Sequence, residues 1–124
     1  MRLVSSQTLT PAAAVVTLSG DLDLATAPEL RNTLQEALTE RRHLVLDMAD
    51  LRFLDSTGIG VLVRIHKKAT ASGGVLAFAA VPPNVTKILE VTCLDRIFPV
   101  YPETEDALSD ITAALTKDAP SAEE

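Results

Sequence analysis

The hexapeptide Asp55-Ser56-Thr57-Gly58-Ile59-Gly60 is the point from which the rest of this chain can be interpreted. Apolar residues between Leu51 and Leu54 precede it, and a helical pattern of apolar residues follows it up to Ser72-Gly73-Gly74. Asp and Ser are frequent N-caps, and glycine is a normal residue at the end of a helix. The hexapeptide therefore predicts a junction at which a buried strand is followed by a helix.

The residues before this junction predict two strands, a helix and a third strand. The first two strands cover 3–8 and 13–19, and the second is nearly continuously apolar, as in a strand buried on both faces. Thr26-Ala27-Pro28-Glu29 fits a capping box, and Glu40-Arg41-Arg42 ends the helix that it opens. The third strand covers 43–47. Such short connections imply a parallel strand pair with a right-handed crossover.

The residues after the junction continue the alternation. A buried strand is expected over 74–79, a short helix from Pro82-Pro83, a short strand over 98–101 and a last helix capped by Thr104. That last helix is expected to turn its apolar residues inward, namely Ala107, Leu108, Ile111 and Leu115. The predicted order is ββαβαβαβα: an α/β domain over 1–116, with four helices and a mostly parallel sheet carrying an N-terminal antiparallel strand. Residues 117–124 are predicted to form a disordered tail.

Composition narrows the possible partners and cofactors. The 124 residues are 47% hydrophobic and 23% charged, which fits one compact domain, and the net charge of −6 argues against direct nucleic-acid binding. No apolar run is long enough to span a membrane, and no signal-peptide core follows Met1. Cys93 is the single cysteine, and with His43 and His66 it forms no ligand-like spacing. We therefore expect a cytoplasmic protein without metal or cofactor, as a monomer or weak dimer.

Two acidic segments are expected at the same edge of the sheet as Ser56. In parallel sheets, active groups gather where strands end, and the loops 20–23 and 51–56 both follow predicted strands. On the helix after Ser56, one exposed stripe is predicted, consisting of Thr57, Gly60, Arg64, Lys67, Lys68 and Ala71. Because an exposed helical glycine costs up to about 1 kcal/mol relative to alanine, Gly60 indicates that another backbone comes close there.

The residues alone leave several interpretations of this junction open. Asp55 or Ser56 can be an ordinary N-cap, with Gly58 and Gly60 easing the turn. Gly58-x-Gly60 lacks the third glycine of a dinucleotide fingerprint, and Leu54 stands where a serine-hydrolase elbow requires glycine. A receiver-like phosphoacceptor at Asp55 remains an alternative, with Asp21 and Asp23 as the acidic pair for a metal.

Four segments of the chain resemble the STAS domain family, and in particular bacterial anti-sigma factor antagonists. They are Gly20-Asp21-Leu22-Asp23, Leu44-Val45-Leu46-Asp47, Phe53 through Gly60, and Leu94 through Tyr101. The resemblance implies a non-enzymatic protein whose serine after the aspartate is phosphorylated by an anti-sigma factor that is also a serine kinase. That serine is Ser56. The unphosphorylated form is then expected to bind the anti-sigma factor and free a sigma factor, and a serine phosphatase to reset it.

Together with the acidic loop and the exposed stripe at the same edge of the sheet, the resemblance leads to a set of residues that we expect at the partner surface. They are Asp21, Asp23, Asp55, Ser56, Thr57, Gly58, Gly60 and Arg64. A docking module of another regulatory or transport complex is the alternative within the family. Relatives often have glycine where this chain has Cys93, so a left-handed backbone there would cost about 1–2 kcal/mol. A phosphate on Ser56 suits a helix N-terminus, so it is expected to act at the interface, where no cations meet it, and not on folding.

Overall fold

A five-stranded sheet in the order β1-β2-β3-β4-β5 organises the computed structural model, which describes residues 3–118. β1 runs antiparallel to β2, and the remaining neighbours are parallel. The elements are β1 (Leu3–Leu9), β2 (Ala14–Leu22), α1 (Ala27–Glu40), β3 (Leu44–Leu54), α2 (Ser56–Ala71), β4 (Leu76–Ala79), α3 (Pro83–Val91), the 3-10 helix η1 (Leu94–Arg96), β5 (Val100–Tyr101) and α4 (Thr104–Asp118). The predicted α/β class and the order ββαβαβαβα are confirmed.

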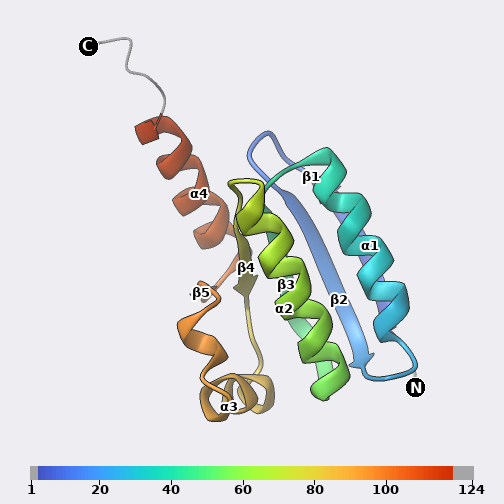
Figure 1. The fold of residues 1–124 in the computed structure, drawn as a ribbon. Helices are drawn as coiled ribbons and strands as arrows, with labels where there is room; N and C mark the ends of the chain where they lie inside the picture. Colours follow the sequence, from blue (N-terminus) through green and yellow to red (C-terminus); the bar gives the residue numbers. More distant parts are fainter. Residues whose placement is uncertain (1–2, 119–124) are drawn as a thin grey trace.

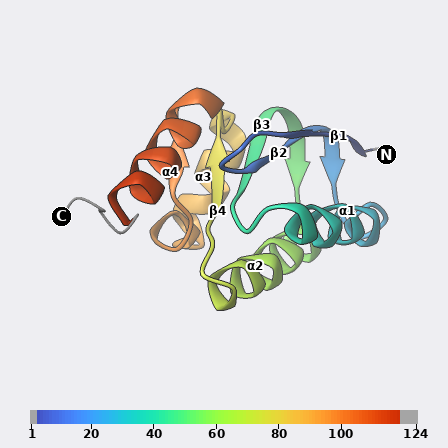
Figure 2. The same cartoon turned by 90° about the horizontal axis from the view of Figure 1, so that it is seen from above.

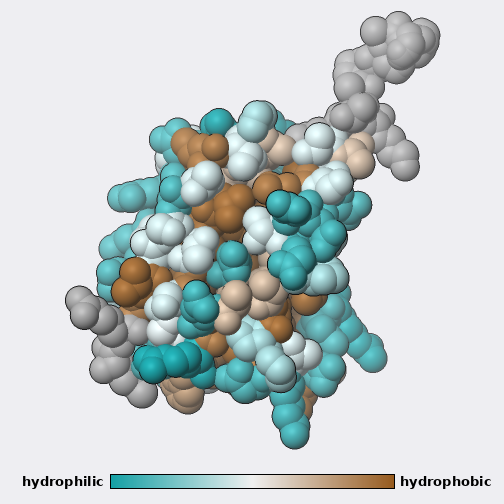
Figure 3. Space-filling model, turned by 180° about the vertical axis from the view of Figure 1, so that it is seen from behind, coloured by the Kyte–Doolittle hydropathy of each residue, from teal (hydrophilic) through white to brown (hydrophobic). Residues whose placement is uncertain are grey.

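The helices divide between the two faces of the sheet. α1 and α2 lie side by side on one face (Figure 1), and α4 lies on the other side of the sheet (Figure 2). The larger core contains apolar side chains of α1, α2 and α3, and the smaller one joins Ala107 and Ile111 of α4 to Val15, Val45 and Ala77. Seen from behind, the face opposite α1 and α2 carries interspersed apolar and polar residues (Figure 3).

β2 and β3 extend further than the sequence predicted, through segments that were expected to be loops. Asp21 pairs with Phe53 and Leu22 with Leu54. Two register shifts precede these pairs: β3 advances from Asp47 to Asp50 while β2 advances only from Thr17 to Ser19, and a second shift lies between Gly20 and Asp21. Each such bulge adds a residue to one strand and lets pairing resume beyond it. The predicted acidic loops therefore form the last rungs of the sheet as far as Leu22 and Leu54, and only Asp23, Asp55 and Ser56 lie beyond the strands.

The start of α1 also differs from the predicted capping box. Thr26 is at the N-cap position, but its side chain makes no cap hydrogen bond to the helix. The Thr26 hydroxyl instead donates to the Asp21 carbonyl (2.8 Å) and accepts from the Asp23 N–H (2.9 Å). The threonine thus closes the turn that leaves β2, because its hydroxyl can either bond back to this turn or cap α1.

The end of the chain is described only in part. Lys117 and Asp118, which the sequence assigned to the tail, belong to α4, whereas 119–124 and the side chain of Leu115 lie outside the described residues. Within residues 3–118, no helix combines the length and the apolar character that a membrane span requires.

Candidate functional site

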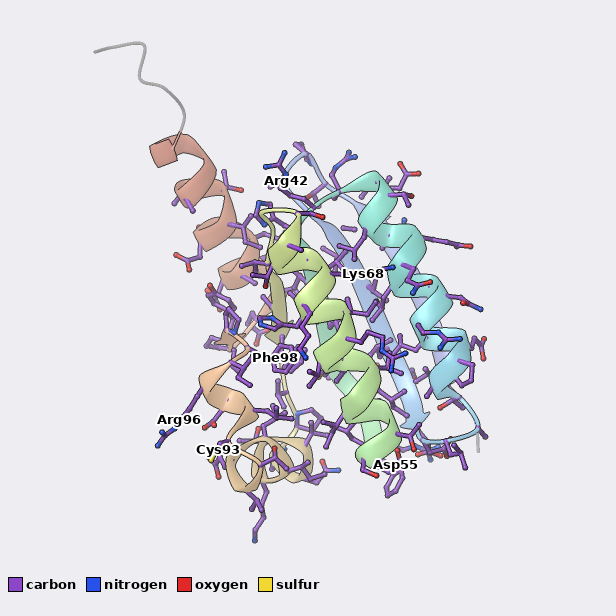
Figure 4. The ribbon with its side chains drawn as sticks, viewed as in Figure 1. Arg42, Asp55, Lys68, Cys93, Arg96 and Phe98 are labelled. Atoms are coloured by element: carbon purple, nitrogen blue, oxygen red, sulfur yellow. The ribbon has the colours of Figure 1, made fainter. Side chains whose placement is uncertain are left out.

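Asp55 holds the junction between β3 and α2 together. One carboxylate oxygen accepts the Gly58 N–H (3.0 Å), which makes Asp55 the N-cap of α2, and the other accepts the Leu24 N–H (3.2 Å). Figure 4 shows Asp55 at the end of α2 nearest the turn that leaves β2. One side chain therefore fixes both the start of α2 and the segment that precedes α1. The sequence had left the cap open between Asp55 and Ser56.

Ser56 is the first residue of α2, and its side chain is exposed. The first N–H groups of a helix have no partner inside the helix and carry its positive dipole end, which favours a negative charge. The neighbouring hydroxyl residue, Thr57, is half-buried. Ser56 is therefore the hydroxyl that another protein reaches more readily.

Positions 58 and 60 of the junction are both glycine, but their surroundings differ. A Cβ atom on Gly58 would lie 2.6 Å from the Leu22 Cγ and 2.9 Å from the Leu54 Cδ1, so this position has no room for a side chain. A Cβ atom on Gly60 would meet no atom within 4 Å, and Gly60 is exposed. Packing inside the domain thus explains Gly58, whereas nothing in the described residues requires glycine at position 60.

Asp21 and Asp23 lie at this edge, but each carboxylate already has a partner. Asp23 accepts the Ala25 N–H (3.0 Å) and the Thr26 N–H (3.1 Å), so it stabilises the turn before α1. Asp21 lies 3.5 Å from the Arg52 guanidinium. Both residues are buried. The Asp23 carboxylate therefore holds the backbone of the turn before α1, whereas the Asp21 carboxylate pairs with the Arg52 side chain.

This arrangement weighs against a receiver-like metal site. The carboxylates of Asp23 and Asp55 accept backbone N–H groups, and Asp21 faces an arginine. Among residues 3–118, no group of three or more His, Cys, Asp or Glu side chains is arranged to hold a metal ion. The edge is built to support a backbone geometry.

A groove of about 360 Å³ lies between α1 and α2 beside Ser56. We call it the α1–α2 groove. α2 contributes Ser56, Thr57, Gly60, Val61 and Arg64, and the start of α1 and the turn before it contribute Leu24, Ala27, Pro28 and Arg31. The structure thus places Gly60 and Arg64 on one face of α2, as predicted, and adds Ser56 to that face.

The contribution of α1 to this groove was not predicted from the sequence. Leu24, Pro28 and Arg31 belong to the segment that was interpreted only as a capping box and an amphipathic helix. A helical projection places Arg31 next to the buried Leu30 and Leu34, which identifies the flank of the helix on which it lies. It does not show that this flank faces α2, because that depends on the packing of two helices separated by β3.

Two titratable groups with shifted pKa values lie at the other end of the sheet. Burial lowers the pKa of His43, and the neighbouring Arg42 lowers it further. Burial raises the pKa of Tyr101 to about 12, with a further contribution from its 2.5 Å hydrogen bond to the Asp110 carboxylate. Figure 4 shows Arg42 at the end of the molecule opposite Asp55.

The expected left-handed position at the end of the third helix is present. Cys93 has φ 61° and ψ 19°, and it is exposed. Ala80 also has a positive φ, of 54°, and this was not predicted from the sequence. A side chain at such a position strains the backbone.

Comparison with known proteins identifies relatives of the whole fold. The STAS domain family matches residues 6–107. The anti-sigma F factor antagonist of Paenibacillus polymyxa is 35% identical over 78% of this chain and 85% of its own. The anti-sigma-B factor antagonist of Bacillus subtilis is 28% identical over 73% and 83%. The crystal structure of an anti-sigma factor antagonist from Mycobacterium paratuberculosis superposes with a TM-score of 0.81 at 28% identity, covering 90% of this chain and 95% of that one.

Proposed function

The chain belongs to the STAS domain family, and from this premise we propose that it is an anti-sigma factor antagonist. The proposal is supported by the relatives of matching length, which carry that name. In the cytoplasm, the unphosphorylated protein binds an anti-sigma factor with serine kinase activity and so releases a sigma factor. Phosphorylation of Ser56 ends the binding, and a serine phosphatase restores it. The chain itself catalyses nothing, because Ser56 is the substrate of its partner's active site.

The exposed position of Ser56 at the start of α2 is the observation that carries this proposal. Asp55 fixes the start of α2 and the neighbouring turn before α1, so the hydroxyl is presented on a rigid element. The partner surface surrounds it and includes Thr57, Gly58, Gly60 and Arg64, with Asp21, Asp23 and Asp55 as its supports. The protein acts as a monomer or weak dimer.

A phosphate on Ser56 adds about 1.5 to 2 negative charges to a helix N-terminus, where the dipole favours them. The modification therefore leaves the domain folded and acts on the interface. Arg31 and Arg64 of this chain line the same groove as Ser56, and the hypothesis that no cations meet the phosphate concerns the partner surface. The phosphate therefore weakens binding by placing charge and volume where the partner must dock.

The test is phosphorylation of the purified protein by each anti-sigma serine kinase of the source organism in the presence of ATP. Mass spectrometry should find phosphate on Ser56, and the Ser56→Ala variant should stay unmodified but still bind the kinase. Thr57→Ala is the matched control, and it should be modified like the native protein. Ser56→Asp should bind on the order of 100-fold more weakly, which corresponds to about 3 kcal/mol.

Two results would contradict the proposal. Phosphate that is released by hydroxylamine would be an acyl phosphate on Asp55, which is the receiver-like alternative. Equal binding of Ser56→Asp and the native protein would show that charge at this position does not control the interface.

A further inference from the structure

We infer that the α1–α2 groove receives a segment of the anti-sigma kinase that carries an apolar side chain next to a carboxylate. The apolar side chain packs on Leu24 and Pro28, and the carboxylate lies between Arg31 and Arg64. This inference rests on the proposed function and adds the chemistry of the partner segment.

The apolar part of the groove is presented in a fixed position. Leu24 is 72% exposed, although leucine is usually buried, and its N–H is held by the Asp55 carboxylate. Pro28 follows on the exposed side of the first turn of α1. A large apolar side chain held exposed at the rim of a groove is typical of a binding contact. The position of Leu24 next to Ser56 makes this contact part of the same interface.

The basic part of the groove contrasts with the charge of the whole chain. Arg31 from α1 and Arg64 from α2 both line it, and none of the lining residues within 3–118 carries a carboxylate. The chain as a whole has a net charge of −6. Two arginines from different helices present planar donor groups, which pair with carboxylate and phosphate groups, and the side chains of an unmodified protein partner offer only carboxylates. The complementary group on the partner is therefore an aspartate or glutamate.

The floor of the groove explains the glycine that the fold itself does not require. Ser56, Gly60 and Arg64 are spaced four residues apart, so they follow one another along a single face of α2. Without a side chain at Gly60, the space between the phosphoacceptor and Arg64 stays open. A phosphate on Ser56 enters this same space. It therefore opposes the partner's carboxylate and competes with it for Arg64.

The test uses the purified kinase that phosphorylates Ser56, with affinities measured by isothermal titration calorimetry at two salt concentrations. Arg31→Glu and Arg64→Glu should each weaken binding at least about tenfold and reduce its salt dependence. Gly60→Leu should weaken it comparably, because its side chain fills the floor. Lys68→Glu is the matched control: Lys68 is exposed on the same helix, lies away from Asp55 (Figure 4), does not line the groove, and should change the affinity less than about threefold.

The phosphorylation reaction gives a second measure. Because the groove serves docking, the arginine variants should raise KM for the protein substrate and leave kcat unchanged. If the native protein binds the kinase but Arg64→Glu and Lys68→Glu lose affinity equally, the inference is overturned and the proposed function remains intact. A kcat loss at constant KM would overturn it as well. Failure of the native protein to bind any anti-sigma kinase would instead refute the proposed function itself.

Discussion

Replacing each of the two glycines at the start of α2 by alanine should change stability in opposite directions. Gly60 is an exposed interior residue of the helix, and an added Cβ atom meets nothing within 4 Å. Glycine is about 1 kcal/mol worse than alanine at such a position. Gly60→Ala should therefore stabilise the domain by about 1 kcal/mol, which raises Tm by about 4 °C in a chain of this size.

Gly58→Ala gains the same helix propensity but meets two buried leucines. Its Cβ atom would stand 2.6 Å from the Leu22 Cγ and 2.9 Å from the Leu54 Cδ1, and both side chains are almost fully buried. Overpacking of a core typically costs about 1–3 kcal/mol, and the Leu22 Cγ could move aside only by rotation about the Cα–Cβ bond, which the surrounding buried side chains hinder. After the propensity gain of about 1 kcal/mol is subtracted, Gly58→Ala should destabilise the domain by up to about 2 kcal/mol.

Urea and thermal unfolding followed by far-UV circular dichroism measure both changes, since the chain has no tryptophan. Each variant serves as the control for the other, because they differ in environment but lie in the same helical turn. A loss of stability in Gly60→Ala would show that position 60 contributes to the fold, which removes the reason to assign its glycine to the partner. A gain in Gly58→Ala would show that the packing against Leu22 is looser than the structure indicates.

Further predictions concern Cys93, which follows α3, and the contact between Tyr101 of β5 and Asp110 of α4. Cys93→Gly should stabilise the protein by about 1 kcal/mol, because relief of the left-handed strain exceeds the added entropy of the unfolded chain. The control variant Cys93→Ser should leave the free energy of urea unfolding unchanged. An equal gain in stability in Cys93→Ser would show that the thiol, and not the backbone, causes the effect. Tyr101, the single tyrosine, should titrate in ultraviolet absorbance near pH 12, and Asp110→Asn should lower its pKa only in part, because burial is the larger cause. Since the folded pKa lies above 10, the contribution of Tyr101 to stability is present below pH 10 and is lost as the pH rises towards 12; a midpoint near 10 in the folded protein would contradict this.

Local patterns were sufficient for the elements and their order. The apolar runs at 14–18 and 44–46, and the four-residue spacing of Leu30 and Leu34, predicted strands and helices that the structure contains. The ends of β2 and β3 were predicted too early. Their last rungs pair across bulges, and a bulge depends on the partner strand as much as on its own residues.

In the candidate site, too, some features could be predicted from the local sequence and others depend on tertiary contacts. Asp55, Ser56 and the exposed stripe of α2 could be identified from the sequence, because capping and helical periodicity are set by residues within two turns. The hydrogen bonds of Thr26 could not be predicted from the sequence, because its hydroxyl can bond either to the helix or to the preceding turn. The position of the Asp21 carbonyl decides between the two.

The sequence by itself determined that an aspartate and a serine follow one another where a buried strand meets a helix. Only the tertiary structure decided what surrounds that serine. The Asp55 carboxylate reaches the Leu24 N–H across 31 residues of sequence, and Arg31 meets the face of Arg64 because α1 and α2 pack side by side on one sheet. Such contacts have no local signature, since the residues approach one another only when apolar faces elsewhere in the chain are buried together.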